Sequence, residues 1–316
     1  MPQIIFEGRH YDSHPGETVL ETLLKHGALL PSKCKTGTCR TCMVRVVSGT
    51  PPAEGQKNLK DTLVALGFFL PCCGEPEEDL EIAHVDVSDH EVMLTLAERV
   101  ELSDGVVRLR LHSDEPFRYR PGQYVNLVRP RDEAVRSYCL ASAPEDDHFL
   151  EVHVQRRDGG DMSRWLCDEL PGGGEVGAYG PAGDCFFLPN NLDRPILLAA
   201  ADTGMAPAWG ILGDALRHGH RGPITVVHGA VDAHGLYLDA ALKELAAKHE
   251  QVTYVPVVMG AGEDHAALGA AIDALGDLKG WRGYLCGPPG VVKLLRKKAF
   301  LNGAASADLY AVAFGD

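Results

Sequence analysis

The sequence predicts a multidomain chain that combines α+β and α/β architecture, and three observations along its 316 residues support this. Five of the nine cysteines lie within the first 73 residues. Short strand-like runs separated by Gly and Pro turns fill residues 92–190, a pattern typical of a closed antiparallel barrel. From residue 191 onward, apolar strands alternate with helical stretches, which predicts a parallel sheet with helices on both faces. We therefore expect three domains, at residues 1–86, 92–190 and 191–316.

The expected elements follow from hydrophobic spacing. In the first segment we expect a strand at 4–6, a helix over 17–24 that Gly27 ends, and a strand at 43–47. The clearest strands of the second segment are 106–111, 124–128 and 150–154. Those of the third segment are 196–201, 224–228, 252–258 and 284–286, with a helical stretch at 238–249.

Composition excludes several classes of protein. Hydrophobic residues make up 45% of the chain and charged residues 23%, as in globular proteins. The formal charge of -14 argues against a nucleic-acid partner, because binding to phosphates needs a basic surface. No run approaches the ~20 apolar residues of a membrane helix, and the N-terminus has no signal-peptide pattern. We expect a cytoplasmic protein with no membrane partner.

The cysteines of the first segment have the spacing of a metal site. Cys34, Cys39 and Cys42 form C-x4-C-x2-C, and Cys72 follows after 29 intervening residues, which is the plant-type [2Fe–2S] pattern. Thiolates are the soft ligands that such clusters need. A structural zinc site is the alternative, but zinc ribbons usually pair two C-x2-C knuckles and only one is present. Cys73 could replace Cys72 as the fourth ligand.

Several short motifs, taken together and in order, resemble a known family. Residues 30–42 with 69–72 resemble the ferredoxin domain of bacterial oxygenase reductases. The later motifs resemble those of the ferredoxin–NADP reductase superfamily, and they are Arg136-Ser137-Tyr138-Cys139 (R-x-Y-S), Gly160-Asp161-Met162-Ser163 (pyrophosphate loop), Ala201-Asp202-Thr203-Gly204-Met205-Ala206-Pro207 (G-G-T-G-I-A-P) and Cys286-Gly287-Pro288-Pro289 (C-G-P-P). Taken alone, each of these has a purely structural explanation, such as a capped helix or a turn at a strand end.

The resemblance is to the NADH-dependent, ferredoxin-type reductases of bacterial oxygenase systems, such as the benzoate dioxygenase, phenol hydroxylase and methane monooxygenase reductases. It covers essentially the whole chain. It implies a β-grasp ferredoxin domain, a six-stranded antiparallel flavin-binding barrel and a five-stranded parallel α/β nicotinamide-binding domain. One departure is Arg40, where that family usually has Gly or another small residue. A positive charge there could raise the cluster potential or help to dock an acidic partner.

The resemblance also implies roles for individual residues. The cluster ligands are Cys34, Cys39, Cys42 and Cys72. Cys286 near the nicotinamide, Cys139 near flavin N5 and Phe314 over the flavin ring are the expected catalytic residues. The expected cofactor-binding residues are Arg136, Ser137, Tyr138, Cys139, Ser142, His153, Val154, Gln155, Gly160, Met162, Ser163, Thr203, Gly204, Met205, Pro207, Cys286, Gly287, Pro288 and Phe314.

Two of these positions have a clear chemical reason, and one is unusual. Arg136 would neutralise a phosphate, and the Tyr138 ring would pack beside the isoalloxazine. Cys139 stands where the motif has Ser, and a thiol is the weaker hydrogen-bond donor.

The sequence partly indicates which cofactors the chain binds. Residues 230–237 contain no Arg or Lys, and Asp232 would repel the 2′-phosphate of NADPH, so we expect NADH. Asp202 places a negative charge where a pyrophosphate would bind. We expect FAD. FMN is the alternative, because the Arg136 motif alone does not show how many phosphates the flavin nucleotide carries.

The implied activity is NADH-dependent electron transfer. A hydride passes from NADH to FAD, and single electrons then leave through the [2Fe–2S] cluster to a redox-protein acceptor. Plant-type clusters have potentials of about -400 mV, so the outlet is another redox protein. By family analogy this is a Rieske or di-iron oxygenase component. Two alternatives stay open: a deoxysugar reductase or other acceptor, and a carrier subunit without its own NADH activity, which the departures at Asp202 and Cys139 would permit.

Overall fold

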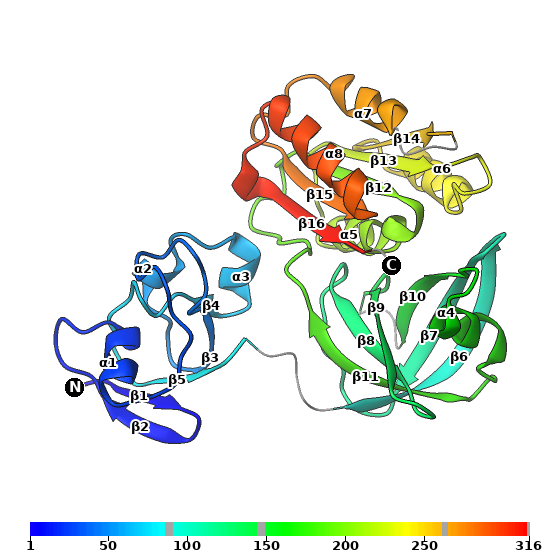
Figure 1. Cartoon of the computed structure of the whole chain (residues 1–316). Coiled ribbons are helices and arrows are strands. Elements are labelled where there is room, and N and C mark those ends of the chain that lie inside the picture. Colours follow the sequence, from blue (N-terminus) through cyan, green and yellow to red (C-terminus); the bar gives the residue numbers. More distant parts are fainter. Residues whose placement is uncertain (86–90, 144–148, 261–264, 315–316) are drawn as a thin grey trace. The chain divides into compact units, whose positions relative to one another are not determined.

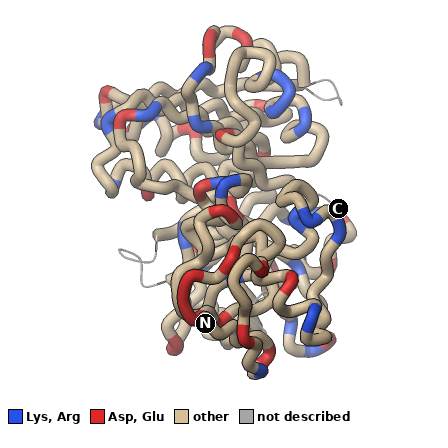
Figure 2. The backbone as a smooth tube through the Cα atoms, turned by 90° about the vertical axis from the view of Figure 1, so that its left-hand side faces the viewer, with Lys and Arg blue, Asp and Glu red and all other residues tan. Residues whose placement is uncertain are grey.

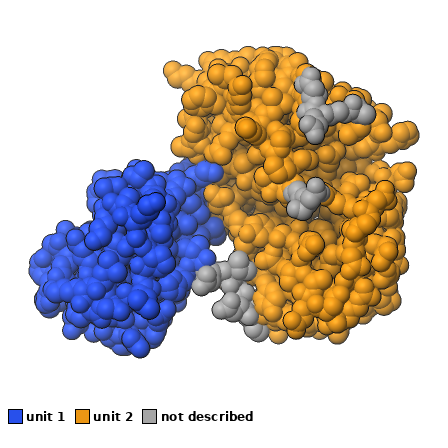
Figure 3. Space-filling view, viewed as in Figure 1, with its two compact units in different colours: residues 1–87 blue, residues 88–316 orange. Residues whose placement is uncertain are grey.

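The computed structural model describes residues 1–85, 91–143, 149–260 and 265–314 (Figure 1). The chain divides into two compact units, Met1–Val87 and Ser88–Asp316, which are blue and orange in Figure 3. The expected end of the first domain, residue 86, lies outside the described residues. None of the helices in the described ranges is long and apolar enough to cross a membrane.

The first unit is a mixed five-stranded sheet with short helices. Its strand order is β2-β1-β5-β3-β4, in which β1 pairs with β5 in parallel and the other pairs are antiparallel. The strands are β1 (Gln3–Phe6), β2 (Arg9–Asp12), β3 (Val44–Ser48), β4 (Phe68–Phe69) and β5 (Leu80–Ala83). The helices are α1 (Val19–Lys25), α2 (Ala53–Gln56) and α3 (Asp61–Ala65). This arrangement confirms the expected β-grasp architecture.

Helix α1 begins where the sequence places its start signal. The Thr18 hydroxyl accepts a hydrogen bond from the Glu21 backbone N–H, and the Glu21 carboxylate accepts one from the Thr18 N–H. This capping box satisfies two N–H groups that the helix leaves without partners. Val19, Leu20 and Leu23 then point into the core of the unit.

The second sheet is a six-stranded antiparallel barrel. Its order is β10-β7-β6-β11-β8-β9, and a bridge between Leu140 and Val152 joins its two ends. The strands are β6 (Val92–Ser103), β7 (Val106–Ser113), β8 (Tyr124–Arg129), β9 (Ala134–Cys139), β10 (Leu150–Gln155) and β11 (Glu175–Ala182). Alternate residues point inward, so Leu94, Leu109, Leu127 and Val176 fill the interior. The short helix α4 (Asp161–Arg164) and the π-helical turn Trp165–Glu169 lie between β10 and β11 in the chain.

The third sheet is parallel throughout, with the order β14-β13-β12-β15-β16. Its strands are β12 (Ile196–Ala201), β13 (Ile224–Ala230), β14 (Val252–Val258), β15 (Arg282–Gly287) and β16 (Leu309–Ala313). The helices are α5 (Met205–Arg217), α6 (Asp239–Lys248), α7 (Ala266–Asp273) and α8 (Pro289–Leu301). Helices α5 and α6 contribute to the hydrophobic core on one face of the sheet, and α7 and α8 to the core on the other. The expected doubly covered α/β sheet is confirmed.

A buried polar network joins the barrel to the parallel sheet within the second unit. The Glu151 carboxylate on β10 contacts Arg110 Nε at 3.0 Å and His153 Nε2 at 3.1 Å. His153 Nδ1 lies 3.1 Å from the hydroxyl of Tyr237, which precedes α6. Burial acts to raise the pKa of Glu151, but the bonds from His153 and Arg110 outweigh it and lower that pKa. The carboxylate is therefore ionised and fixes the His153 ring for Tyr237.

The charge of the chain is spread over both units, as the red acidic and blue basic segments in Figure 2 show. Many exposed carboxylates have a cationic neighbour. Glu98, for example, lies 3.0 Å from Arg108 and 3.1 Å from Arg110, with 43% of its side chain exposed. An exposed pair of this kind contributes little stability, whereas the buried Glu151 should contribute much more.

We expect Glu151→Gln to lower the free energy of unfolding by about 1.5–3 kcal/mol at pH 7, because it removes hydrogen bonds to a charged, buried group. The folded-state pKa of Glu151 is lowered. Its contribution is therefore complete above the unfolded pKa of about 4.3 and is lost as the pH falls through the folded value. Urea denaturation at pH 7, 5 and 3 should show the variant approaching the wild type only at the lowest pH. Glu98→Gln, at the exposed partner of the same arginines, should change stability by less than about 1 kcal/mol.

Candidate functional site

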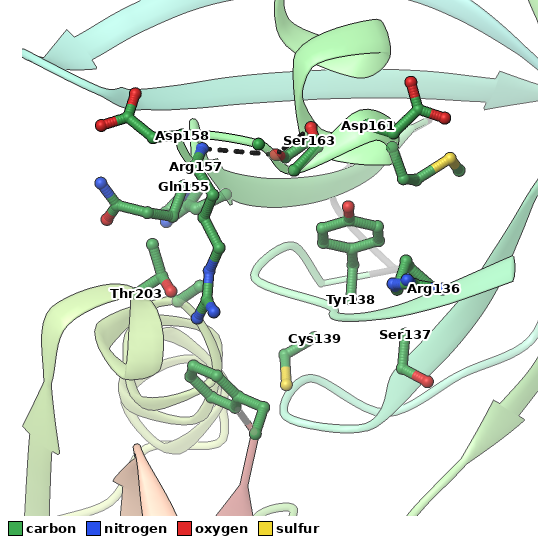
Figure 4. A pocket seen from close by; sticks show the side chains of 16 residues that line it. Arg136, Ser137, Tyr138, Cys139, Gln155, Arg157, Asp158, Asp161, Ser163 and Thr203 are labelled. Atoms are coloured by element: carbon green, nitrogen blue, oxygen red, sulfur yellow. Dashed lines mark hydrogen bonds between the residues drawn. The ribbon is translucent and has the colours of Figure 1, made fainter. Parts of the chain in front are cut away.

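A cavity of about 430 Å³ opens between the barrel and the start of α5 (Figure 4). It gathers residues from β9, β10, the loop before α4, the turn before α5 and the C-terminal segment. The expected residues that line it are Arg136, Ser137, Tyr138, Cys139, His153, Gln155, Gly160, Met162, Ser163, Thr203 and Phe314. The lining also includes Arg157, Asp158 and Gly159, which lie outside the motifs, and Asp161 and Ala206, two motif positions that were not among the expected binding residues.

The loop at one side of the cavity is held by its own hydrogen bonds. The Ser163 hydroxyl accepts a bond from the Arg157 backbone N–H at 3.3 Å and donates one to the Gly160 carbonyl at 3.0 Å. The Asp161 carboxylate is paired with the buried Arg129, and this contact lowers the pKa of Asp161. Arg129 therefore compensates the charge of Asp161, one of the two carboxylates on this side of the cavity.

Two arginines and an aromatic ring give the cavity the character of a flavin nucleotide site. Figure 4 shows the Tyr138 hydroxyl directed toward the Ser163 loop and the Cys139 sulfur pointing the opposite way. The exposed Arg136 lies on β9, and the Arg157 side chain extends beside Thr203. Cations of this type bind phosphates, and an aromatic ring packs well against isoalloxazine. The residues present therefore fit FAD.

Cys139 carries a protonated thiol. Burial raises its pKa to about 12, so the sulfur is S–H throughout the neutral pH range. A protonated thiol is a weak hydrogen-bond donor and a poor nucleophile.

Several expected residues lie outside the lining of this cavity. Ser142 is buried, and its hydroxyl lies 2.6 Å from the Tyr119 hydroxyl and accepts a bond from the Glu151 N–H at 2.8 Å. Val154 fills the barrel interior, and Met205, the first residue of α5, packs in the core on one face of the parallel sheet. The others outside the lining are Gly204, Pro207, Cys286, Gly287 and Pro288.

The two nicotinamide motifs are brought together by close backbone packing. A Cβ atom on Gly204 would lie 2.4 Å from the Cys286 carbonyl oxygen, so no larger residue fits at this position. The Phe314 N–H donates to the Gly287 carbonyl at 3.2 Å, which ties the C-terminal segment to the same place. Asp202 adopts a φ of +52°, a left-handed conformation that Asp tolerates better than most residues. This explains why the resembling motif has Gly at that position.

A second cavity, of about 410 Å³, adjoins the first at Gln155, which lines both. Its lining residues are Ser103, Asp104, Val106, Gln155, Asp202, Val231, Asp232, His234, Gly235 and Tyr237. None of these is Arg or Lys, as expected for a site that takes NADH rather than NADPH. The Asp232 Oδ1 atom accepts bonds from the His234 and Gly235 backbone N–H groups, which holds this carboxylate in the cavity wall. Burial raises the pKa of Asp202 above its usual range.

The expected cluster ligands lie in two pairs. The Cys39 and Thr36 backbone N–H groups donate to Cys34 Sγ at 3.4 and 3.5 Å, and these bonds lower the pKa of Cys34 to about 5. Cys42 and Cys72 are buried in the core of the first unit, and burial together with the Cys72 thiol raises the pKa of Cys42 to about 12. Across the described ranges, no three His, Cys, Asp or Glu side chains converge as a metal site.

The chemistry of these thiols nevertheless suits an iron–sulfur cluster. Two thiols line the interior and two lie in an exposed or half-buried loop, and amide N–H groups stabilise the outer thiolate. Metal binding displaces the protons of the inner pair. Gly37 has a φ of +74°, and a Cβ there would lie 2.7 Å from Cys73 Sγ. Cys73 is only partly buried at the edge of the core, whereas Cys72 lies within it.

Comparison with known protein families agrees with the three kinds of cofactor site described above. The 2Fe-2S iron-sulfur cluster binding domain matches residues 5–77, the oxidoreductase FAD-binding domain residues 93–187 and the oxidoreductase NAD-binding domain residues 198–297. The three matches follow the order of the three sheets.

Individual relatives cover nearly the whole chain. The reductase subunit of an aromatic O-demethylase from Amycolatopsis sp. is 36% identical over 304 residues, which cover 90% of each protein. The phenol 2-monooxygenase reductase component DmpP of Pseudomonas sp. is 31% identical, over 90% of this chain and 86% of its own. The crystal structure of the Amycolatopsis cytochrome P450 reductase GcoB superposes with a TM-score of 0.67 at 30% identity, over 99% of both chains.

The chain belongs to the family of oxygenase-system reductases within the ferredoxin–NADP reductase superfamily. It is an NADH-dependent oxidoreductase that uses FAD and a [2Fe–2S] cluster for electron transfer.

The contacts of Ser142 give a test of how the flavin site is supported. We expect Ser142→Ala to lower the free energy of unfolding by about 1–3 kcal/mol, because it leaves buried partners unsatisfied. Flavin affinity, measured by fluorescence titration of the refilled protein, should change by less than about threefold, under about 1 kcal/mol. Ser137→Ala, at an exposed position of the lining, should leave stability within about 0.5 kcal/mol. A large loss of flavin affinity with unchanged stability would instead assign Ser142 to direct cofactor binding.

Proposed function

We propose that the chain is the reductase component of a multicomponent mono- or dioxygenase, and that its electrons pass to an oxygenase component. The main structural support for this function is the cavity that brings Tyr138, Cys139, Thr203 and Phe314 together. It adjoins a second cavity that has no Arg or Lys in its lining and so suits NADH. The names of relatives support the acceptor class, since they include reductase components for phenol, naphthalene and toluate oxygenases. We assign residues 1–86 to the cluster, 92–190 to FAD and 191–316 to NADH, and we place the protein in the cytoplasm.

Each group of residues at the site has a distinct role in this proposal. When bound, FAD accepts a hydride from NADH and releases two electrons one at a time. Arg136 and Arg157 hold the flavin phosphates, and Tyr138 packs along the ring. Phe314 shields the face that the nicotinamide must reach, and Cys286 with Gly204 positions the nicotinamide end of NADH. Cys34, Cys39, Cys42 and Cys72 hold the cluster through which single electrons leave.

The electron path can be tested by separating its two steps. We expect Cys42→Ser to keep NADH-dependent reduction of ferricyanide, which the flavin supports, and to lose about 10²-fold or more of cytochrome c reduction, which needs the cluster. Cys73→Ser is the matched control, and it should keep both activities together with the iron–sulfur absorbance. If Cys42→Ser retained cytochrome c reduction, the cluster would not lie on the path. If Cys73→Ser lost the cluster, Cys73 would replace Cys72 as the ligand.

Cys139 offers a second test, at the place where the hydride enters. A hydroxyl is a stronger donor than the protonated Cys139 thiol, so Cys139→Ser should speed flavin bleaching by NADH by about threefold to tenfold, equivalent to about 1 kcal/mol. Cys139→Ala, which has no donor, should slow it. Anaerobic stopped-flow absorbance measures both rates at saturating NADH. Equal rates in all three proteins would remove Cys139 from the reaction.

A deoxysugar dehydrase is the second candidate acceptor. It is favoured by the CDP-6-deoxy-L-threo-D-glycero-4-hexulose-3-dehydrase reductase of Yersinia pseudotuberculosis, which is 27% identical over 96% of this chain. The genes beside the coding sequence distinguish the two, because an oxygenase subunit or a dehydrase should be encoded there. Reconstitution of NADH consumption with the neighbouring gene product then tests the assignment.

A further inference from the structure

The cysteine loop of the first unit carries a group of exposed cations in an otherwise acidic chain. Lys33, Lys35 and Arg40, which we call the loop cations, are all exposed and flank Cys34 and Cys39. Residues 22–53 contain no Asp or Glu, although the whole chain has a formal charge of -14. This loop is where a cluster would come nearest to solvent. Its net charge is therefore positive, whereas the net charge of the rest of the molecule is negative.

The loop cations have no carboxylate partner within the part of the chain that the structure describes, because no salt bridge there engages Lys33, Lys35 or Arg40. Lys35 exerts a weak attraction on the Glu21 carboxylate, which is already held by the Thr18 N–H and hydroxyl. These charges are consequently available to a partner.

Two of the loop cations lie at backbone positions that disfavour a side chain. Lys35 and Arg40 have φ values of +56° and +57°, a left-handed conformation that disfavours residues with a Cβ. Glycine would adopt it without strain. The Arg40 guanidinium also donates from Nη2 to the Asn58 carbonyl at 3.2 Å, which holds it across the loop. Lys35 and Arg40 therefore carry long side chains at two positions where glycine would be less strained.

We propose that the loop cations form the docking surface for the electron acceptor, and that the acceptor is a protein whose redox centre is surrounded by acidic residues. This proposal rests on the proposed function and adds the charge of the partner. Each cycle oxidises one NADH to NAD⁺ and a proton, and two acceptor centres each gain one electron. Complementary charges around the two centres raise the rate of productive encounter and align the centres for transfer.

Charge reversal at the loop, compared with reversal elsewhere, tests the proposal. The probes are cytochrome b5, an acidic haem protein, and cytochrome c, a basic one, both reduced by the holoenzyme with NADH. We expect Arg40→Glu to lower the second-order rate constant for cytochrome b5 by about threefold or more at ~0.01 M ionic strength. The rate for cytochrome c should stay equal or rise. At ~1 M ionic strength, where the screening length is about 3 Å, the variant and the wild type should converge.

Arg9→Glu is the matched control. Arg9 is an exposed arginine in the same unit, on the edge strand β2 at the far end of the sheet order from β4, and its reversal changes the net charge equally. It should alter both rate constants by less than about 1.5-fold at the same ionic strength. An equal effect of Arg9→Glu and Arg40→Glu would show that only net charge matters and would overturn the proposal.

Arg40→Gly separates docking from folding. The substitution removes the left-handed strain, so the thermal midpoint should rise or stay unchanged. The rate with cytochrome b5 should nevertheless fall, and the protein should bind cytochrome b5 more weakly in a calorimetric titration without NADH. A variant that docks as well as the wild type would contradict the proposal.

Failure of the proposed function would look different. In that case NADH would bleach neither the flavin nor the cluster, and neither cytochrome would be reduced by any variant. Failure of the docking proposal alone would leave NADH bleaching and the reduction of both cytochromes intact, with no dependence on Arg40.

Discussion

The contact between Gly204 and the Cys286 carbonyl is the constraint on which the nicotinamide end of the site depends. Strands β12 and β15 are parallel neighbours, and these residues lie where the two strands end. Ligands of open α/β sheets bind at this edge. Because the backbones meet with no room for a side chain, the turn before α5 and the turn before α8 act as one surface. The bond from Phe314 to Gly287 then adds the C-terminal segment to it.

The second constraint is the buried path from Glu151 through His153 to Tyr237. It joins a barrel strand to the parallel-sheet layer by hydrogen bonds of 3.1 Å at both ends of the histidine. His153 lines the first cavity, which we propose for FAD, and Tyr237 lines the second, which we propose for NADH, so the network forms part of the wall between them. Two cofactors that exchange a hydride need such fixed proximity, because a small displacement of the reacting atoms is costly in rate.

Sequence patterns predicted the sheets well, and they also pointed to several residues that the fold brings to one cavity. Strand and helix periods, with Gly and Pro turns, were sufficient for the barrel and the parallel sheet because both are built from regular, repeated elements. Arg157 could not be found in this way, since an exposed arginine after a strand has no distinctive spacing. The contacts of Ser142 depend on Tyr119, 23 residues away, and such a tertiary partner leaves no local signal.

The cysteine loop also has features that could not be predicted from sequence spacing. Spacing alone left Cys72 and Cys73 as alternatives, and Cys72 stays the predicted ligand, since the fold buries it with Cys42 in the core while Cys73 is only partly buried. The sequence also showed that cations lie beside the cysteines. The left-handed backbone of Lys35 and Arg40, and the lack of salt bridges to the loop cations among the described residues, emerged from the structure.

We propose that electrons enter from NADH at the flavin cavity and leave singly through the cysteine loop. An anaerobic visible spectrum of the purified protein, recorded before and after addition of NADH, tests this path. Flavin and iron–sulfur bands should both bleach within seconds with NADH, and much more slowly with an equal amount of NADPH. Bands that are present but do not bleach with NADH would contradict it and would identify a carrier subunit that another protein reduces.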